Sequence, residues 1–234
     1  MTRNLNKLFA VTLLASLSMI STQASADGSS FSAYVSEQST VNGQSLNMVL
    51  PIQSGAHDYF AGSASITVGS TASNGTSFLA YCIDPTQWAS STPTLYTVSD
   101  LSALGSSQAA EVTKLYSQSY ASTSGNNLNS AAFQIALWEL AKDDGVLTTG
   151  AVQTTSSTGA SVINAASSMI SNAKTGIAGP ANYSFNLYSN SAQQDFLVAS
   201  ESSVSPVPEP NTYALMIAGL GLIGFTARRR RVAN

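Results

Sequence analysis

Apolar and polar residues alternate along the first half of the chain, and this pattern predicts β-strands. The alternating segments cover residues 31–37, 46–52, 60–68 and 76–82, with glycine and asparagine in the stretches between them. Two further segments of this kind, 183–188 and 194–199, are typical of a late hairpin. We therefore expect a sheet whose strands come from both ends of the folded region.

The middle of the chain has helical spacing instead. Residues 107–121 predict a first helix capped by Ser106 or Ser107, and residues 160–173 predict a third. Between them, a second helix is expected to start at a cap formed by Asn129 or Ser130 and to end at Lys142. The segments 122–127 and 148–159 are polar and are predicted to be loops.

The second helix carries a polar residue on its apolar face. Gln134, Leu137, Trp138 and Ala141 follow the i, i+3, i+4, i+7 spacing of one side of a helix. A glutamine on a buried face needs hydrogen-bond partners, since an unpaired amide costs about 1–3 kcal/mol.

The N-terminus has the features of a secretory signal peptide. Arg3 and Lys7 precede an apolar run over residues 8–20, and Ala24 and Ala26 fit the small-residue rule for cleavage. The apolar run is shorter than the roughly 17–25 residues that a membrane-spanning helix needs. We therefore assign residues 1–26 to the signal peptide and expect the exported chain to begin at Asp27.

The C-terminus carries a second targeting pattern. Pro208, Glu209 and Pro210 are followed by an apolar segment over residues 213–227, expected to be a single membrane helix, and then by Arg228, Arg229, Arg230 and Arg231. Arginines after an apolar segment hold that end in the cytoplasm, which leaves the preceding chain outside. Residues 201–206 form a linker before this tail.

This tail, residues 207–231, resembles the PEP-CTERM sorting signal. The resemblance implies recognition by an exosortase, a transient stage in the inner membrane, removal of the tail, and delivery to the outer surface or extracellular matrix of a Gram-negative bacterium. Exosortase is therefore an expected partner.

Charge excludes one class of function. Outside the two targeting segments the only basic residues are Lys114, Lys142 and Lys174, against nearly all of the chain's 12 acidic residues. Binding to nucleic acid depends on neutralising phosphates, so an acidic protein without arginine is not expected to bind it. Residues 27–200 are long enough for one domain with its own core.

Cys82 is the single cysteine of an exported chain, so it cannot form an internal disulfide. It is a core residue, an intermolecular partner or a reactive thiol. If the Cys82 thiolate attacks the carboxamide of Gln134 and ammonia leaves, the product is a thioester, which aromatic walls such as Tyr81, Trp88, Phe133 and Trp138 would shield from water.

Two short motifs resemble the thioester domains of bacterial surface adhesins. They are Tyr81-Cys82 at a strand end and Phe133-Gln134-Ile135-Ala136-Leu137-Trp138 on a helix. The resemblance implies an α+β fold in which a strand-rich half, a β-sandwich or barrel-like structure, carries a helical insertion with the glutamine. It also implies a Cys82–Gln134 thioester that captures an amine-bearing surface protein or matrix component. Many members have threonine where this chain has Phe133, which removes a hydroxyl group.

Three functions remain open at this point: a covalent adhesin that is not an enzyme, a structural biofilm or matrix protein without a reactive bond in use, and a hydrolase with His57 as base. No oxyanion-stabilising motif supports the hydrolase. We expect no cofactor and no metal site, because Asp143-Asp144-Gly145 lacks the periodic ligands of a calcium loop and has the pattern of a helix end.

Overall fold

The computed structural model describes residues 31–179 and 182–202. Its sheet is antiparallel and contains seven strands: β1 (Phe31–Val49), β2 (Ala56–Thr71), β3 (Asn74–Cys82), β4 (Thr94–Ser99), β5 (Gln153–Thr154), β6 (Tyr183–Ser189) and β7 (Phe196–Glu201). Three α-helices, α1 (Ser106–Ser119), α2 (Asn127–Lys142) and α3 (Ala160–Thr175), lie between β4 and β6 in the chain. Two short 3₁₀ helices cover Leu101–Leu104 and Tyr120–Thr123.

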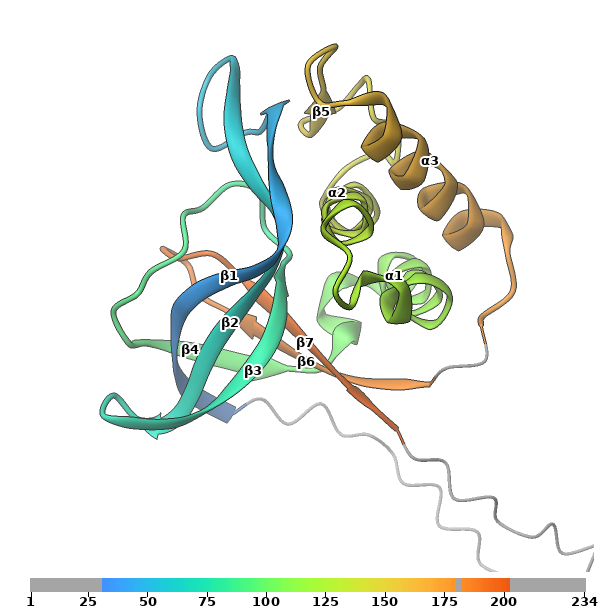
Figure 1. Ribbon diagram of the computed structural model, residues 1–234. Coiled ribbons are helices and arrows are strands. Elements are labelled where there is room, and N and C mark those ends of the chain that lie inside the picture. Colours follow the sequence, from blue (N-terminus) through green and yellow to red (C-terminus); the bar gives the residue numbers. More distant parts are fainter. Residues whose placement is uncertain (1–30, 180–181, 203–234) are drawn as a thin grey trace, which may run out of the picture.

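The sheet closes on itself. The strand order is β2-β3-β7-β6-β4-β1, and β1 also pairs with β2, so these six strands form a ring. The short strand β5 joins the far end of β1. The expected α+β class is confirmed, and the strand-rich half has the barrel-like form rather than that of a sandwich (Figure 1).

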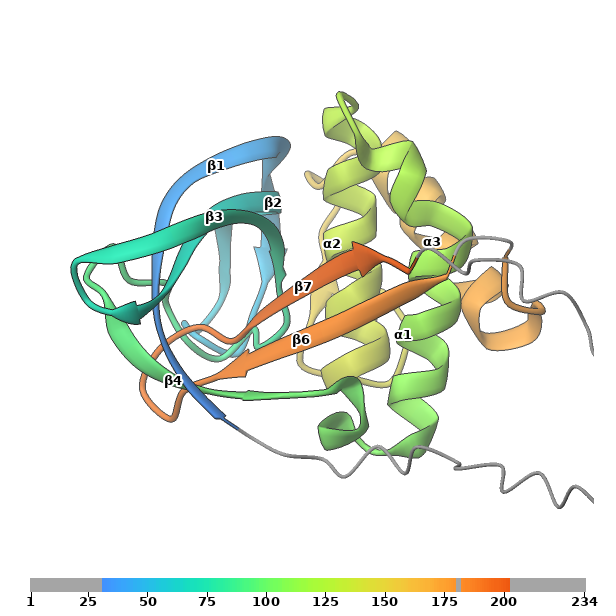
Figure 2. The same ribbon diagram turned by 90° about the horizontal axis from the view of Figure 1, so that it is seen from below.

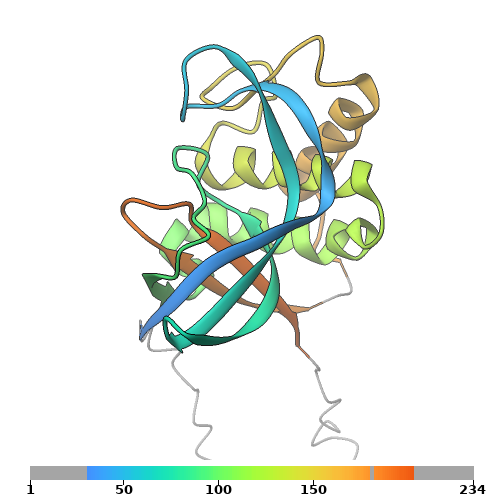
Figure 3. The ribbon, with the colours of Figure 1, turned by 60° about the vertical axis from the view of Figure 1, so that its left-hand side comes forward.

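One long strand replaces two predicted ones. β1 runs through Asn42 and Gly43, where the sequence suggests a break, and irregular pairing with β2 between residues 37 and 43 absorbs the bend. Gly43 lies opposite Gly62 at this bend, and a Cβ on Gly43 would sit 2.2 Å from the Ala61 carbonyl oxygen. The close approach lets the β1–β2 hairpin leave the barrel and extend beside the helices (Figure 3).

Two strands fall in segments that were not predicted as strands. β4 follows a Ser/Thr/Pro-rich stretch and is only six residues long, although Tyr96 and Val98 alternate into the barrel interior. β5 lies inside the predicted 148–159 loop and consists of two residues that pair with Met48 and Val49. Such a strand has no periodicity of its own and exists because β1 is already in place.

The helices match their predicted positions but not their predicted caps. The Asn126 side chain accepts a hydrogen bond from the Asn129 main-chain N–H, so Asn126 is the N-cap of α2, not Asn129 or Ser130. The N-terminus of α1 follows Gly105 without a side-chain cap, so neither Ser106 nor Ser107 has that role. The α2 C-terminus at Lys142 is as expected.

Helix α2 is the centre of the molecule. It packs against β1 and β2 on one side and against α1 and α3 on the other, so helices and barrel form adjacent layers (Figures 1 and 2). Every residue from Ser130 to Ala141 is buried. The prediction of one buried face is therefore too narrow, because a helix that is surrounded by other elements buries residues on all of its sides, including the polar Gln134 and Glu139.

Two apolar clusters divide the core. One fills the barrel interior and includes Tyr96 and Phe196, and the other lies between the sheet and the helices and includes Phe133 and Leu137. Cys82 packs against both clusters, at the point where the barrel meets α2.

No helix within the described ranges is long and apolar enough to cross a bilayer. The predicted signal peptide, the C-terminal membrane helix and the sorting segment all lie outside these ranges, as do residues 203–206 of the predicted linker.

Candidate functional site

The fold brings Cys82 and Gln134 together. Cys82 is the last residue of β3, and Gln134 lies in the interior of α2, which packs across the neighbouring strands. The two positions are 52 residues apart in sequence. Their proximity therefore depends on the packing of the helical insertion onto the barrel.

Two hydrogen bonds hold the Gln134 carboxamide against the main chain of Cys82. The Cys82 N–H donates to Gln134 Oε1 at 3.1 Å, and Gln134 Nε2 donates to the Cys82 carbonyl oxygen at 2.7 Å. Gln134 is 1% exposed, so this pair of bonds meets the need for partners that burial imposes. The two bonds also fix which way the amide faces, with its carbonyl oxygen on the Cys82 N–H.

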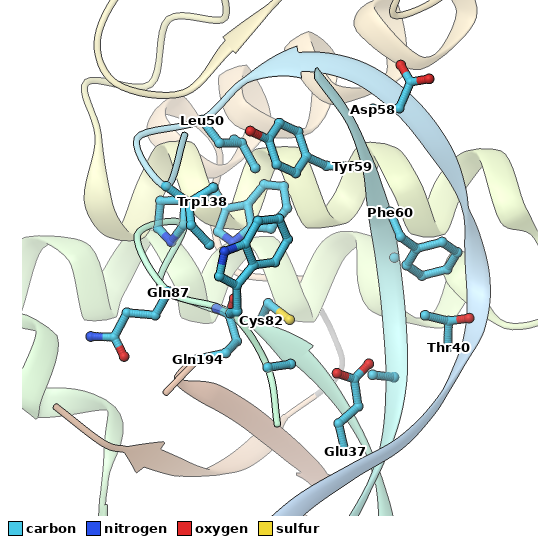
Figure 4. Close-up of a pocket in the computed structure, with 16 residues that line it drawn as sticks. Glu37, Thr40, Leu50, Asp58, Tyr59, Phe60, Cys82, Gln87, Trp138 and Gln194 are labelled. Atoms are coloured by element: carbon cyan, nitrogen blue, oxygen red, sulfur yellow. The ribbon is translucent and has the colours of Figure 1, made fainter. Parts of the chain in front are cut away.

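A cavity of about 210 Å³ opens beside the cysteine. Its lining includes Cys82, Trp88, Trp138, Tyr59 and Glu37, which come from β1, β2, β3, α2 and the loop after β3 (Figure 4). Trp88 is 59% exposed, and its ring packs on that of Tyr59 with the centroids 6.0 Å apart. The thiol is thus at the edge of a cavity with aromatic and polar lining that a ligand can enter from solvent.

Burial controls the ionisation of the thiol. Removal from water raises the pKa of the Cys82 thiol well above its usual range, and the negative charge of Glu37 raises it further. A thiol with a raised pKa is a weak nucleophile at neutral pH because little thiolate is present. Any reaction at Cys82 therefore needs a group that accepts its proton.

Glu37 is placed to be that group. It lies on β1 next to the irregular pairing at residues 37–39, lines the cavity, and points its carboxylate toward the thiol (Figure 4). Burial raises the pKa of its carboxyl group, which makes it a stronger base than an exposed glutamate. Sequence reasoning missed Glu37 because the bend that aims it is formed by strand pairing.

The cavity also contains unpaired polar atoms. Tyr59 Oη, Gln87 Oε1 and Trp138 Nε1 are buried and have no hydrogen-bond partner within the described part of the chain, and all three residues line the cavity. Buried polar atoms are nearly always paired, so donors and an acceptor left free around one cavity indicate a place for a polar ligand or water.

The four aromatic residues predicted to surround the thioester lie on two different sides of β3. Trp138 and Trp88 line the cavity, whereas Tyr81 and Phe133 pack on each other with ring centroids 4.8 Å apart, inside the cluster between sheet and helices. Adjacent strand residues face opposite ways, so Tyr81 cannot share the side of Cys82. The Tyr81 hydroxyl is hydrogen-bonded to Ser130 on α2 at 2.7 Å, which ties the end of β3 to the helix that carries Gln134.

A second glutamine holds the loop after Cys82. Gln194 Nε2 donates to the Asp84 carbonyl oxygen, and the Gln194 N–H donates to the Trp88 carbonyl oxygen at 2.9 Å. These contacts attach the loop to the start of β7 and position Trp88 at the mouth of the cavity. The sequence gives no signal for Gln194, since it lies 110 residues from Asp84.

His57 is not part of this site. Its Nε2 lies 2.9 Å from the Ser54 carbonyl oxygen in an exposed turn at the start of β2, and it is not among the residues lining the cavity beside Cys82. The cysteine–histidine arrangement that a hydrolase needs is therefore not formed by the described residues.

The remaining predicted site residues lie outside the described ranges. They are the cleavage positions Ala24 and Ala26 and the sorting residues Pro208, Glu209, Pro210, Arg228, Arg229, Arg230 and Arg231.

No curated protein sequence matches this chain. Among solved structures, the N-terminal thioester domain of a surface protein from Clostridium perfringens is similar to it, with a TM-score of 0.42 and 15% identity over 74% of this chain and 100% of that one. A cysteine-to-alanine mutant of that domain matches with a TM-score of 0.39 and 16% identity over 67% of this chain and 99% of the other.

Residues 206–231 match the family model of the PEP-CTERM protein-sorting motif. This agrees with the segment predicted from the Pro-Glu-Pro triplet, the apolar run and the arginines. The motif implies export, exosortase processing and a place at the cell surface of a Gram-negative bacterium.

Proposed function

We propose that the exported domain forms an internal thioester between Cys82 and Gln134 and uses it to attach covalently to amine groups of a partner surface. The observation that carries this proposal is the pair of hydrogen bonds that holds the Gln134 carboxamide on the main chain of the residue whose thiol would attack it. Each molecule reacts once, so the protein is a covalent binder and not a catalyst.

Formation of the bond is an acyl transfer within the folded chain. Cys82 Sγ attacks Cδ of Gln134, the C–N bond breaks, and ammonia leaves with the proton of the thiol. The Cys82 N–H at 3.1 Å from Oε1 stabilises the negative charge that develops on this oxygen, as donors in an oxyanion hole do. Glu37 accepts the thiol proton and passes it to the departing nitrogen.

The same surroundings preserve the bond once it is made. A thiol whose pKa is raised by burial is a poor leaving group, so attack by water is slow. Trp138 and Trp88 limit access to the bond from the cavity side. The bond then persists until a stronger nucleophile enters.

Capture of a partner amine is a second acyl transfer, from Cys82 to the amine. An amine adds to the carbonyl carbon, the C–S bond breaks, Cys82 regains its proton, and the product is an amide between Gln134 and the partner. Glu37 and Asp58 line the cavity and attract a cationic amine, and Glu37 then removes its proton so that the nitrogen can attack. The aromatic rings of Trp88 and Tyr59 are suited to contact with such a cation.

A structural matrix protein is the second candidate function. The hydrogen bonds of Gln134 are complete without any covalent bond, and Cys82 packs against both apolar clusters as an ordinary core residue does. In that case the cavity is a binding site without covalent chemistry.

Mass spectrometry of the freshly exported protein separates the two. A thioester makes the intact chain lighter than its sequence mass by one ammonia, and methylamine then adds to Gln134. Cys82→Ala keeps the sequence mass and takes up no methylamine. An unmodified wild-type mass would contradict the thioester, and an intact thioester that captures no amine-bearing partner would favour the matrix role.

A further inference from the structure

Three carboxylates meet at the end of α2, away from the cavity. Glu139 belongs to the last turns of the helix, and Asp143 and Asp144 follow its final residue. One carboxylate oxygen from each residue lies within 4.8 Å of the other two. Groups of like charge this close repel one another unless a cation or a proton lies between them.

Glu139 is the unusual member of the group. Its side chain is 0% exposed, and Oε2 accepts a hydrogen bond from the Val146 N–H at 3.1 Å. Oε1 is buried and has no hydrogen-bond partner within residues 31–179 and 182–202. A buried carboxylate oxygen without a partner is costly, which indicates that the folded protein has a ligand for it.

The two aspartates are held in fixed orientations. Asp143 Oδ2 accepts hydrogen bonds from the main-chain N–H groups of residues 151 and 152, at 2.8 and 2.6 Å. Asp144 accepts one from the Val146 N–H and one from the Thr149 hydroxyl, each at 2.8 Å. The loop thus organises the carboxylates before any ligand arrives, and each of the two carboxylates retains at least one free lone pair.

The hydrogen bond of Lys174 at this place goes to the main chain. Lys174 Nζ donates to the main-chain carbonyl oxygen of Asp144 at 2.7 Å, not to a carboxylate. The C-terminus of α2 adds partial negative charge at the same place. Burial and the charges of Asp143 and Asp144 raise the pKa of Glu139 to about 8.

From this arrangement we infer that Glu139, Asp143 and Asp144 bind a calcium ion. Oxygen ligands suit a hard cation, and Ca²⁺ accepts them in a flexible geometry with water in the remaining positions, whereas Mg²⁺ requires bonds of about 2.0–2.1 Å and a stricter octahedron. Water completes the coordination on the exposed side of Asp144. The site joins the end of α2 to the loop that leads to β5.

A calcium-loop pattern does not reveal this site. The ligands of such loops alternate along one segment, but here the buried ligand comes from within a helix, four residues before Asp143. The inference is therefore contrary to the expectation, drawn from the sequence, that the chain has no metal site. It does not depend on the thioester.

The test is calorimetric titration of CaCl₂ into the chelator-treated exported protein, with thermal unfolding in the presence of calcium or of magnesium. We expect a single site with a dissociation constant of about 10⁻⁴–10⁻³ M, as in extracellular calcium modules, and a melting temperature that calcium raises more than magnesium does. Glu139→Gln and Asp144→Asn should each weaken calcium binding at least tenfold. Glu111→Gln, which changes a carboxylate on α1, is the matched control and should bind as the wild type does.

Two results would overturn the inference. One is the absence of any calcium-dependent heat or melting shift in the wild type. The other is an equal response in wild type, Glu111→Gln and Asp144→Asn, which would indicate non-specific charge binding. Asp144 is exposed, so its variant tests the site even if Glu139→Gln fails to fold.

Discussion

The Cys82→Ala variant tests the covalent bond through stability. The two hydrogen bonds of Gln134 use the main chain of Cys82, so they remain when its side chain is shortened. The variant loses one sulfur atom and the proposed cross-link. A cross-link between positions 52 residues apart restricts the unfolded chain and is worth up to about 4 kcal/mol by the loop-entropy relation used for disulfides.

Loss of the sulfur alone is a much smaller effect. Cys82 is only partly buried, and removing a small buried group costs about 1 kcal/mol. A destabilisation of about 4–5 kcal/mol therefore indicates the cross-link, and one of about 1 kcal/mol indicates packing alone. For a domain of this size, the larger value lowers the melting temperature by on the order of 10 °C.

Calorimetric or fluorescence melting at mildly acidic pH measures this difference, because amines are protonated there and do not attack the thioester as the chain unfolds. Methylamine treatment of the wild type should lower the melting temperature by nearly as much as the mutation, and it should leave Cys82→Ala unchanged. Similar melting temperatures for wild type, methylamine-treated wild type and Cys82→Ala would refute the reasoning.

Three further predictions concern Glu37, Gln134 and the sorting tail. Glu37→Gln should slow methylamine uptake by about 10²-fold, because the variant lacks the carboxylate that acts as the base. Mass spectra recorded over time give the rate of uptake. Faster uptake in the variant would mean that the charge of Glu37 only raises the pKa of Cys82. With the methylamine-opened wild type as the reference, Gln134→Ala should destabilise the domain by about 3–5 kcal/mol more than Cys82→Ala does. The reason is that Gln134→Ala leaves the Cys82 N–H and C=O unpaired and creates a cavity beside them. Denaturant titration measures both free energies of unfolding, and equal values would argue against the two hydrogen bonds. Replacing Pro208-Glu209-Pro210 should retain the chain in the inner membrane, and membrane fractionation with immunoblotting would detect this. Wild-type protein at the cell surface that still ends in the four arginines would contradict exosortase processing.

The spacing of apolar residues predicted most of the strands and helices, because this spacing reflects only which side chains of a short segment face the core. The alternating segments and the helical spacing follow from which side chains must face a core, and they located β2, β3, β6, β7 and the three helices. They failed where pairing decides the structure. β1 continues through Gly43 because β2 pairs with it there, and β5 is a strand only because Met48 and Val49 lie beside it.

For the site, the sequence determined the candidate residue types and the sorting signal of the chain. A single cysteine, a glutamine within an apolar helix and a tail that directs export are written in consecutive residues, and each can be read without a fold. Tertiary structure alone decided that Cys82 and Gln134 share two hydrogen bonds, that Glu37 faces the thiol, and that Tyr81 and Phe133 lie on the other side. The physical reason is that these relations depend on how α2 packs on a closed barrel, and packing joins residues that no local pattern connects.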